Sequence, residues 1–278
     1  MNYAELKKRG RELLERAGLE DPEGDAKALL LGCFHLSLTD YALHMHDEVP
    51  DENENTYLEL IARRAEREPV QYILGTAPFL GFDFVVTPDV LIPRFDTEIL
   101  VEYALGRLHS GDEILDLCTG SGCVIISLLR LGPEGMSGTG SDLSENALLI
   151  AEKNAGRLET GVNFVHSDLF EQIDGRYDMI VSNPPYIRSE EVDRLDREVR
   201  EYEPRMALDG AGDGLYFYRK IISGADAHLK DSGVLAVEIG YDQGEAVSRL
   251  MRESGLKSVC ILQDLAGRDR VVFGEKHE

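Results

Sequence analysis

Three features are missing from the sequence: a long apolar run, an excess of basic residues, and paired cysteines. No apolar run approaches the ~18 residues that a membrane span requires. The opening residues, "MNYAELKKRGRELLERAG", also lack the apolar core of a signal peptide. We therefore expect a cytoplasmic, globular protein that does not associate with a membrane.

Basic residues are scarce, with 29 Lys and Arg against 52 Asp and Glu in 278 residues, and the formal net charge is −23. Binding to the phosphates of a duplex rests on Lys and Arg. We therefore expect no direct nucleic-acid partner. An acidic surface leaves a protein partner or a small cation open.

The cysteines, Cys33, Cys118, Cys123 and Cys260, are scattered, with no C-x-x-C pair and no histidine at zinc spacing. We expect reduced thiols, mostly buried, and no metal site. The chain contains no internal repeat and no low-complexity tract.

What is present suggests two domains, because the length suits about 150 residues for each and the hydrophobic content is 43%. Residues 3–68 have helical periodicity, with Asp21-Pro22 starting one helix and Ser37 or Thr39 capping the next. This predicts a helical N-terminal domain over residues 1–74. Residues 75–93 predict a β-hairpin linker, with Gly81 at its turn and Pro88 closing its second strand.

After Arg94, strand and helix signals alternate, which predicts an α/β, Rossmann-like domain over residues 94–278 with a mostly parallel sheet. Its first helix is expected over 96–109, capped by Asp96 or Thr97. Ligands of such sheets bind at the carboxyl ends of the strands, so the loops after Leu117, Ser141 and Ser182 are the candidate site.

The first of these loops is "DLCTGSGC", where Gly120 and Gly122 permit a tight strand-to-helix turn and close approach of a ligand. Asp142 ends the next strand, where an acid can accept hydrogen bonds from ribose hydroxyls. The nicotinamide fingerprint wants a third glycine where Ile125 stands, which weakens a dehydrogenase interpretation. An ordinary turn, with Asp142 as a helix cap, remains the alternative for this loop alone.

Two later loops add polar groups. Asp168 follows the next strand, where an acid can accept from an adenine amine, although a loop Asp is also a common turn former. The motif "NPPY", residues 183–186, follows a further strand. In this order, the loops resemble the cofactor-binding loops of class I S-adenosylmethionine-dependent methyltransferases.

The "NPPY" motif suits the methylation of a planar amide or amine, which is a poor nucleophile. The Asn183 side-chain oxygen can accept one N–H of such a group and the Pro184 carbonyl the other, which fixes the nitrogen for attack. Tyr186 can pack its ring on the planar group. An Asn-Pro turn with a surface tyrosine is the structural alternative.

The flanking segments resemble one family of these enzymes. "EPVQYILGTAPFLGFDFVVTPDVLIPRFDTEILVE", "LDLCTGSGC", "NPPYI", "YEPRMALDGAGDGLYFYRKI" and "VEIGYDQG" closely resemble the bacterial release factor glutamine methyltransferase (PrmC/HemK) family. The resemblance implies a helical domain that recognises substrate, a hairpin linker and a methyltransferase domain. It also implies methyl transfer from S-adenosylmethionine to the glutamine amide of the Gly-Gly-Gln motif of peptide chain release factors. We expect a monomer, although the sequence alone does not determine the oligomeric state.

Carried over by position, together with the loop acids, the resemblance implies three groups of site residues. The catalytic and substrate-binding residues are Asn183, Pro184, Pro185 and Tyr186. The cofactor-binding residues are Cys118, Thr119, Gly120, Ser121, Gly122, Asp142, Leu143, Asp168, Leu169 and Asn183. Arg94, Thr97 and Glu98 are expected near the cofactor, although a structural ion pair between Arg94 and Glu98 is the alternative.

Three positions depart from the family's commonest pattern. Cys118 stands where glycine is frequent, which suggests that this backbone position need not be left-handed. Phe95 replaces a frequent proline and Leu169 a common tryptophan, so the packing around the adenine is expected to differ. Residues 190–205, rich in charge, are expected to form a solvated helix face or a wall of the channel for the protein substrate.

Other functions stay open at this point. A ribosomal-protein glutamine methyltransferase is expected to differ mainly in the N-terminal domain. A DNA adenine methyltransferase would share "NPPY" but should carry a basic recognition region. A non-catalytic binding module should have lost Asn183 or the glycine loop, and both are present.

Overall fold

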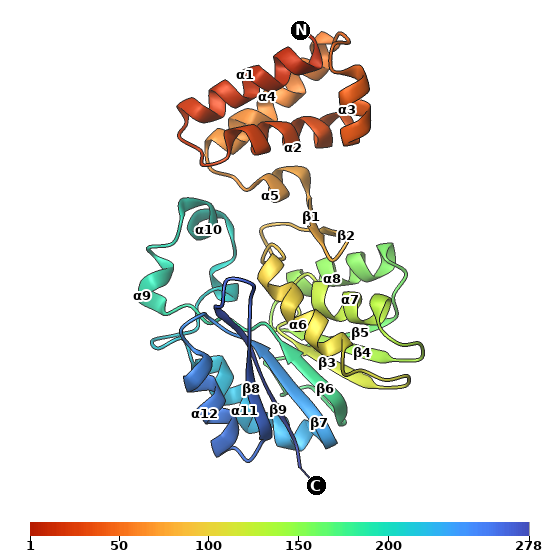
Figure 1. Ribbon diagram of the computed structural model, residues 1–278, viewed down its shortest axis with the longest axis vertical. Helices are drawn as coiled ribbons and strands as arrows, with labels where there is room; N and C mark the ends of the chain where they lie inside the picture. Colours follow the sequence, from red (N-terminus) through yellow and green to blue (C-terminus); the bar gives the residue numbers. More distant parts are fainter. Residues whose placement is uncertain (278) are drawn as a thin grey trace. The chain divides into compact units, whose positions relative to one another are not determined.

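The computed structural model describes residues 1–277 and divides into two compact units (Figure 1). The first unit contains residues 1–76 and the short segment 196–202. The second contains residues 77–195 and the chain from Glu203 onward. The sequence-based division did not anticipate that residues 196–202 belong to the first unit.

The first unit is a bundle of helices around an apolar core. Leu6, Leu14, Leu29, Leu30 and Tyr57 are fully buried in it. Its helices are α1 (Tyr3–Arg16), α2 (Pro22–Phe34), α3 (Leu38–His44), α4 (Asp51–Ala65), α5 (Val70–Leu74) and, from the later segment, α10 (Arg197–Tyr202).

Side-chain caps start the second and third helices at the predicted places. The Asp21 carboxylate accepts a hydrogen bond from the Gly24 N–H at 2.9 Å, directly before Pro22. Ser37, and not Thr39, caps α3, and its hydroxyl accepts from the Asp40 N–H at 3.0 Å.

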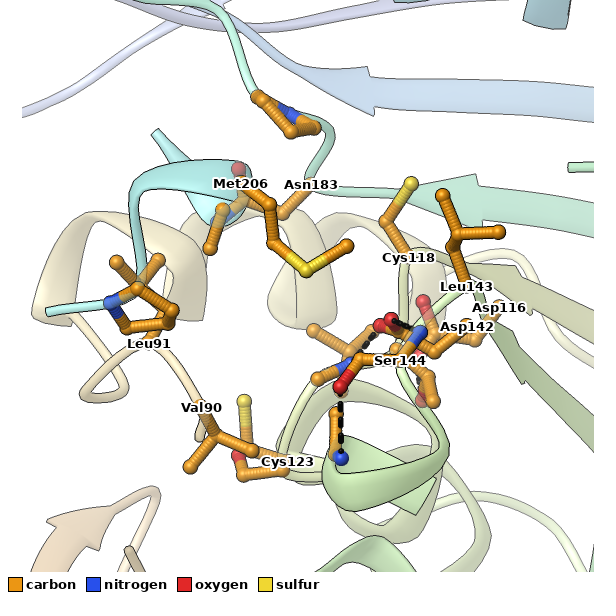
Figure 2. Close-up of a pocket in the computed structure, with 18 of the residues that line it drawn as sticks. Val90, Leu91, Asp116, Cys118, Cys123, Asp142, Leu143, Ser144, Asn183 and Met206 are labelled. Atoms are coloured by element: carbon orange, nitrogen blue, oxygen red, sulfur yellow. Dashed lines mark hydrogen bonds between the residues drawn. The ribbon is translucent and has the colours of Figure 1, made fainter. Parts of the chain in front are cut away.

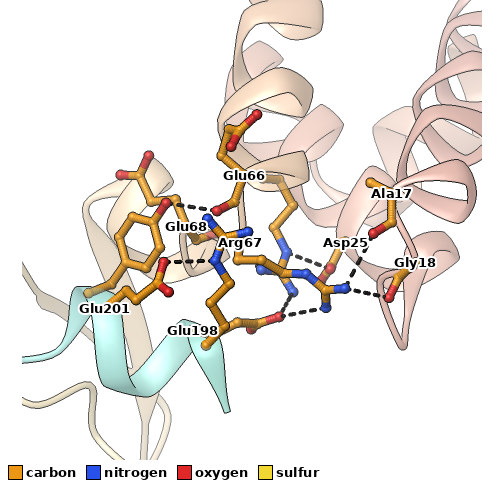
Figure 3. A network of polar contacts seen from close by, with 11 residues as sticks. Ala17, Gly18, Asp25, Glu66, Arg67, Glu68, Glu198 and Glu201 are labelled. Atoms are coloured by element: carbon orange, nitrogen blue, oxygen red, sulfur yellow. Dashed lines mark hydrogen bonds and ion pairs between the residues drawn. The ribbon is translucent and has the colours of Figure 1, made fainter. Parts of the chain in front are cut away.

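A network of charges holds α10 within the first unit (Figure 3). The buried guanidinium of Arg64 pairs with Asp25 at 2.7 Å and with Glu198 at 2.8 Å. The Tyr202 hydroxyl donates to the Glu66 carbonyl at 2.9 Å. Residues 196–202 are therefore more than a solvated helix face, since Glu198 and Tyr202 both contact the bundle.

A hairpin follows the bundle, formed by β1 (Thr76–Phe79) and β2 (Phe82–Val85). Leu80 and Gly81 turn it with φ values of 47° and 80°. The predicted position of the turn is confirmed. The second strand ends at Val85, so the expectation that Pro88 closes it is wrong.

The second unit is built on a seven-stranded sheet with the strand order β5-β4-β3-β6-β7-β9-β8. β9 runs antiparallel to both of its neighbours, while the pairs from β5 to β7 are parallel. This confirms the expected Rossmann-like class. The strands are β3 (Glu113–Leu117), β4 (Ser137–Asp142), β5 (Val162–His166), β6 (Tyr177–Ser182), β7 (Leu229–Glu238), β8 (Lys257–Gln263) and β9 (Asp269–Glu275).

Helices cover both faces of this sheet (Figure 1). Successive residues of a strand point to opposite faces, so Met179 and Val181 of β6 join one core and Ile180 joins the other. The first core includes α6 (Phe95–Leu105), α7 (Cys123–Leu131) and α8 (Glu145–Arg157), and the second includes α11 (Tyr216–His228) and α12 (Gly244–Glu253). The short helices α9 (Ser189–Val192) and η1 (Arg205–Ala207) lie in the connection after β6.

The start of α6 differs from the sequence-based expectation. The helix begins at Phe95 after an extended Arg94, and its N-terminus has no side-chain cap. Asp96 and Thr97 lie inside the first turn instead of capping it. Their side chains have distant partners: Asp96 pairs with Arg270 at 2.9 Å, and Thr97 accepts a hydrogen bond from Asn183.

No helix within residues 1–277 has both the length and the apolar character needed to cross a lipid bilayer.

Candidate active site

One pocket of the second unit lies at the carboxyl ends of β3, β4 and β6 (Figure 2). With its open mouth included, it contains about 1000 Å³ of empty space. β4 and β6 lie on opposite sides of β3, so the strand order reverses here, at the usual ligand site of such sheets. Of the predicted site residues, the wall includes Arg94, Thr97, Cys118, Thr119, Gly120, Ser121, Asp142, Leu143, Asp168, Leu169, Asn183 and Pro185.

The loop between β3 and α7 forms one part of this wall in an unusual backbone conformation. Cys118, Gly120 and Gly122 have φ values of 59°, 54° and 79°. The cysteine suggested that this position need not be left-handed, but its backbone is left-handed in the structure. Asn, Asp and Gly are the common residues in this region, so the cysteine carries backbone strain at a position where glycine would carry none.

The two glycines of this loop have different surroundings. A Cβ atom at Gly120 would meet no heavy atom within 4 Å, because this backbone faces the open pocket. A Cβ atom at Gly122 would lie 2.9 Å from Ile126 Cδ1 and 3.2 Å from Ala151 Cβ. Gly122 thus allows close packing of the loop against α7 and α8, whereas Gly120 leaves room for a ligand.

Asp142 binds the loop from the end of β4. One carboxylate oxygen accepts from the Gly120 N–H and the other from the Ser144 N–H, both at 2.9 Å. Burial raises the pKa of Asp142, and these backbone hydrogen bonds oppose the rise. Ser144 caps α8 through the Ala147 N–H, so Asp142 is not the helix cap.

Asp116 was missed as a site residue by the sequence analysis. It lies within β3, its side chain lines the pocket, and it is 1% exposed. Burial raises its pKa to about 7, although the Thr119 hydroxyl donates to it at 2.6 Å. The available signal was an acid inside the apolar strand "EILDL", where a charge is costly to bury.

Asp168 and Leu169 lie together in the wall, after β5. Leu169 has a φ of 53° and is buried. The Ser167 hydroxyl donates to the Leu169 carbonyl at 2.8 Å and fixes this turn. Asp168 is partly exposed, and its carboxylate lies 3.5 Å from Lys220 Nζ.

Asn183 follows β6 directly, and Figure 2 shows it on the same side of the view as Met206. Its Nδ2 donates to Thr97 Oγ1 at 3.2 Å. Pro184 is buried and Pro185 lines the pocket. Tyr186 lies outside the wall, packs against the core beneath α11 and α12, and directs its hydroxyl to Glu238 Oε1 at 3.4 Å.

Arg94 and Glu98, which were predicted near the cofactor, have different partners in the structure. Arg94 lines the pocket and pairs with the carboxylate of Glu203, which also accepts from the Ile92 N–H at 3.3 Å. Glu98 instead accepts from the Leu80 N–H of the hairpin at 3.0 Å. The alternative of an Arg94–Glu98 ion pair is therefore wrong.

Much of the remaining wall is apolar and was not identified from the sequence. Apart from Phe217 in α11 and two residues in the short helix η1, it lies in irregular segments, whose residues have no periodicity that would relate them to a site. These residues are Val90, Leu91, Pro93, Pro204, Met206, Ala207 and Phe217.

Two protein-family models match separate parts of the chain. The PrmC N-terminal domain matches residues 5–75, and the methyltransferase small domain matches residues 94–199. The first match covers the helical bundle and the second covers most of the pocket loops.

Curated relatives match across both units. A release factor glutamine methyltransferase of Agrobacterium fabrum is 41% identical over 94% of this chain and 93% of its own length. The chain belongs to the release factor glutamine methyltransferase family. A member from Geobacter sulfurreducens is 48% identical over 77% of this chain and 76% of its own length.

Solved structures support the fold alone. A methyltransferase from Pyrococcus furiosus superposes with a TM-score of 0.55 at 16% identity, and covers 78% of this chain and 98% of its own. A 16S rRNA methyltransferase of T. thermophilus, in complex with AdoMet and guanosine, gives 0.52 at 22% identity over 73% of this chain and 50% of its own. Like them, this member of the release factor glutamine methyltransferase family has a methyltransferase fold.

Proposed function

We propose that this protein transfers a methyl group from S-adenosylmethionine to the side-chain amide nitrogen of the glutamine in the Gly-Gly-Gln motif of peptide chain release factors. Membership of the release factor glutamine methyltransferase family supports the substrate class. The observation that carries the chemistry is the placement of Asn183 in the wall of the pocket that also contains the β3–α7 loop.

The residues of the pocket fit S-adenosylmethionine. The backbone at Gly120 borders open space, because a Cβ atom at this position would meet no heavy atom within 4 Å. A ligand can therefore approach this backbone closely. Each Asp142 oxygen accepts one backbone hydrogen bond and keeps a lone pair, which suits it to a ribose hydroxyl. Asp168, Leu143 and Leu169 would border the adenine. When bound, S-adenosylmethionine supplies an electrophilic methyl group.

Asn183 and Pro184 would orient the glutamine amide. Such a nitrogen shares its lone pair with the carbonyl and attacks poorly. The Asn183 Oδ1 and the Pro184 carbonyl would each accept one N–H, which directs the lone pair toward the methyl group. The nitrogen loses one proton as it gains the methyl group, so the products are the N-methyl amide, S-adenosylhomocysteine and a proton.

The helical bundle would select the protein substrate. The match of residues 5–75 to the PrmC N-terminal domain supports a release factor over a ribosomal protein, because the two enzyme classes were expected to differ mainly in this domain. The net charge of −23 is unfavourable for DNA as the substrate.

Mass spectrometry of the Gly-Gly-Gln peptide after incubation of purified release factor with the protein and S-adenosylmethionine tests the proposal. We expect the mass of one methyl group on the glutamine. A release factor with Gln replaced by Glu in that motif, which lacks the amide, should gain none. Methylation of a ribosomal protein in place of the release factor, or of another residue, would contradict the proposed function.

A further inference from the structure

Gln243, directly before α12, has a buried side-chain amide that the proposed chemistry leaves without a role. It is 5% exposed, and it does not cap the helix that it precedes. Its Nε2 donates to the Tyr186 carbonyl at 2.9 Å and to the Gly214 carbonyl at 3.3 Å. Its Oε1 accepts from the Gly240 N–H at 2.9 Å and from the Tyr218 hydroxyl at 3.3 Å. All four hydrogen-bonding positions of the amide are therefore used.

These partners fix the orientation of the amide. The Gly240 N–H can only donate, so it must face Oε1, and the two carbonyl groups can only accept, so they must face Nε2. With the amide reversed, oxygen would face oxygen and N–H would face N–H. Gln243 is thus held as a donor to the backbone of Tyr186, the last residue of the "NPPY" motif.

The peptide group between Tyr186 and Ile187 is held on both sides. Gln243 donates to its carbonyl, and its N–H, from Ile187, donates to the Leu208 carbonyl at 3.0 Å. The two residues before Tyr186 are prolines, which have no N–H with which to anchor the backbone. The contact from Gln243 therefore supplies an anchor at the end of a segment that lacks two of its own donors.

Two glycines bring the following loop into close contact with the same backbone. A Cβ atom at Gly210 would lie 2.7 Å from Tyr186 Cα and 2.9 Å from the Pro185 carbonyl oxygen. At Gly214, which has a φ of 73°, it would lie 2.5 Å from the Tyr186 carbonyl oxygen and 2.7 Å from Gln243 Nε2. A larger residue at position 214 would therefore separate Gln243 from the motif.

We propose that Gln243 is a positioning residue that holds the backbone of the "NPPY" motif so that the Pro184 carbonyl faces the substrate amide. This inference rests on the proposed function. The ring of Pro185 locks one of the backbone dihedrals between the Pro184 carbonyl and the peptide group that Gln243 holds, so few soft dihedrals remain. Fixing that peptide group therefore restricts the direction of the Pro184 carbonyl. Gln243 does not need to touch the reacting atoms for this effect.

The variant Gln243→Met tests this role. Methionine is unbranched and adapts to a buried site, but it has no N–H with which to hold Tyr186. Single-turnover methylation of release factor is measured at saturating S-adenosylmethionine and increasing release factor. We expect the maximal rate to fall about 10-fold or more, because misplacement of a group that orients the substrate is costly to the rate. Calorimetry should show nearly unchanged affinity for S-adenosylmethionine.

The variant Tyr218→Phe is the matched control for the loss of buried hydrogen bonds. It removes the hydroxyl that donates to the Glu238 carbonyl at 2.9 Å and to Gln243 Oε1, and it leaves the contact between Gln243 and Tyr186 in place. Thermal melts should show a lower melting temperature in both variants, whereas Tyr218→Phe should keep most of the wild-type maximal rate. A comparable loss of rate in the two variants would show that general loosening, and not the Tyr186 contact, lowers the rate.

A second pair of variants does not require Gln243→Met to fold. Gly214→Ala places a methyl group between Gln243 and the Tyr186 carbonyl. Gly175→Ala is its control, because Gly175 has a φ of 90°, has no heavy atom within 4 Å of its Cβ position, and precedes β6, whereas the motif follows this strand. Both alanines carry left-handed strain, but only Gly214→Ala should lose maximal rate below its melting transition. Equal rates in the two folded proteins contradict the inference.

The outcomes distinguish this inference from the proposed function. A wild-type protein that leaves the Gly-Gly-Gln glutamine unmodified contradicts the proposed function. If the wild type methylates the glutamine, then a folded Gln243→Met protein with the wild-type maximal rate contradicts the positioning role of Gln243 alone.

Discussion

At the scale of single residues, the second unit keeps two carboxylic acids inside its sheet, Asp116 in β3 and Glu238 in β7. Both are almost fully buried, and burial raises the pKa of each to about 7. When the pKa of an acid is higher in the folded than in the unfolded protein, the folded protein holds more protons at any pH between these two values. The proton bound by the acid therefore stabilises the folded state fully below the pKa of the unfolded protein. This stabilisation is lost as the pH rises through about 7.

The substitution Asp116→Asn tests this for Asp116, whose ordinary pKa is 3.8. Relative to wild type, the variant should gain free energy of unfolding as the pH rises from 4 to 8, by on the order of 4 kcal/mol. Urea titrations across this range measure the change. Asp231→Asn, which removes an exposed carboxylate, is the control. If the stability difference between the wild type and the Asp116→Asn variant stays constant with pH, Asp116 is ionised throughout.

Residues such as Asn183 and Asp142 were predictable as site candidates because each follows a strand in a recognisable motif. Asp116, Glu203 and Glu238 were not, because their roles depend on partners brought together by the fold. Glu203, for example, pairs with Arg94, which lies far from it in sequence. Tyr186 was expected to pack its ring on the substrate amide, but its hydroxyl points to Glu238, which only the packing of β6 beside β7 determines.

At the scale of elements, the β3–α7 loop combines left-handed backbone with two glycines of different surroundings. Gly120→Ala and Gly122→Ala both place a Cβ on a left-handed residue, at a cost of about 1–2 kcal/mol. Gly122→Ala should lower the melting temperature further, because of its contacts with Ile126 and Ala151. Gly120→Ala should mainly weaken S-adenosylmethionine binding, since its methyl group projects toward the pocket.

Calorimetry and thermal melts separate these two effects. Gly156→Ala is a matched control, because Gly156 lies in α8 with a helical backbone and nothing near its Cβ position. It should stabilise the protein by up to about 1 kcal/mol and leave cofactor binding unchanged. Equal loss of cofactor affinity in the Gly120→Ala and Gly156→Ala proteins would argue against close approach of the cofactor at Gly120.

The order and type of the elements followed from the sequence more closely than their boundaries. The alternation of strands and helices after Arg94 predicted the sheet, because apolar runs of strand length alternate with amphipathic segments. The start of α6 was misplaced, since Asp96 and Thr97 are good capping residues by type. Arg270 and Asn183, both remote in sequence, engage these side chains instead.

At the scale of the whole molecule, the chain leaves the second unit after Leu195, contributes α10 to the first unit, and returns at Glu203. This segment lies between the "NPPY" motif and the pocket residues Pro204 and Met206. The two-domain layout was predictable from composition and periodicity. The membership of residues 196–202 in the first unit was not predictable, because a charged helix has the same local sequence pattern whether it faces solvent or pairs with Arg64.

The substitution Glu198→Gln should loosen this segment. It replaces the Glu198 carboxylate, which pairs with the buried Arg64 guanidinium, by a neutral amide. The loss of this ion pair should lower the free energy of unfolding by about 1–3 kcal/mol. Hydrogen exchange in peptides covering residues 196–202 should become faster. Glu201→Gln is the matched control, because Glu201 pairs with Arg197 and Arg200 of its own helix and is exposed. Unchanged protection in the Glu198→Gln protein would show that the Arg64 pair does not hold α10.

The placement of Asn183 in the pocket is the centre of the proposed function, and single-turnover methylation of release factor by Asn183→Ala tests it most directly. Tyr186→Phe, which keeps the ring, serves as the control and should be mildly affected. We expect Asn183→Ala to fold, to keep most of its affinity for S-adenosylmethionine, and to lose about 100-fold or more in rate, because one acceptor at the reacting nitrogen is gone. A folded Asn183→Ala protein that methylates the glutamine at close to the wild-type rate would contradict the proposal.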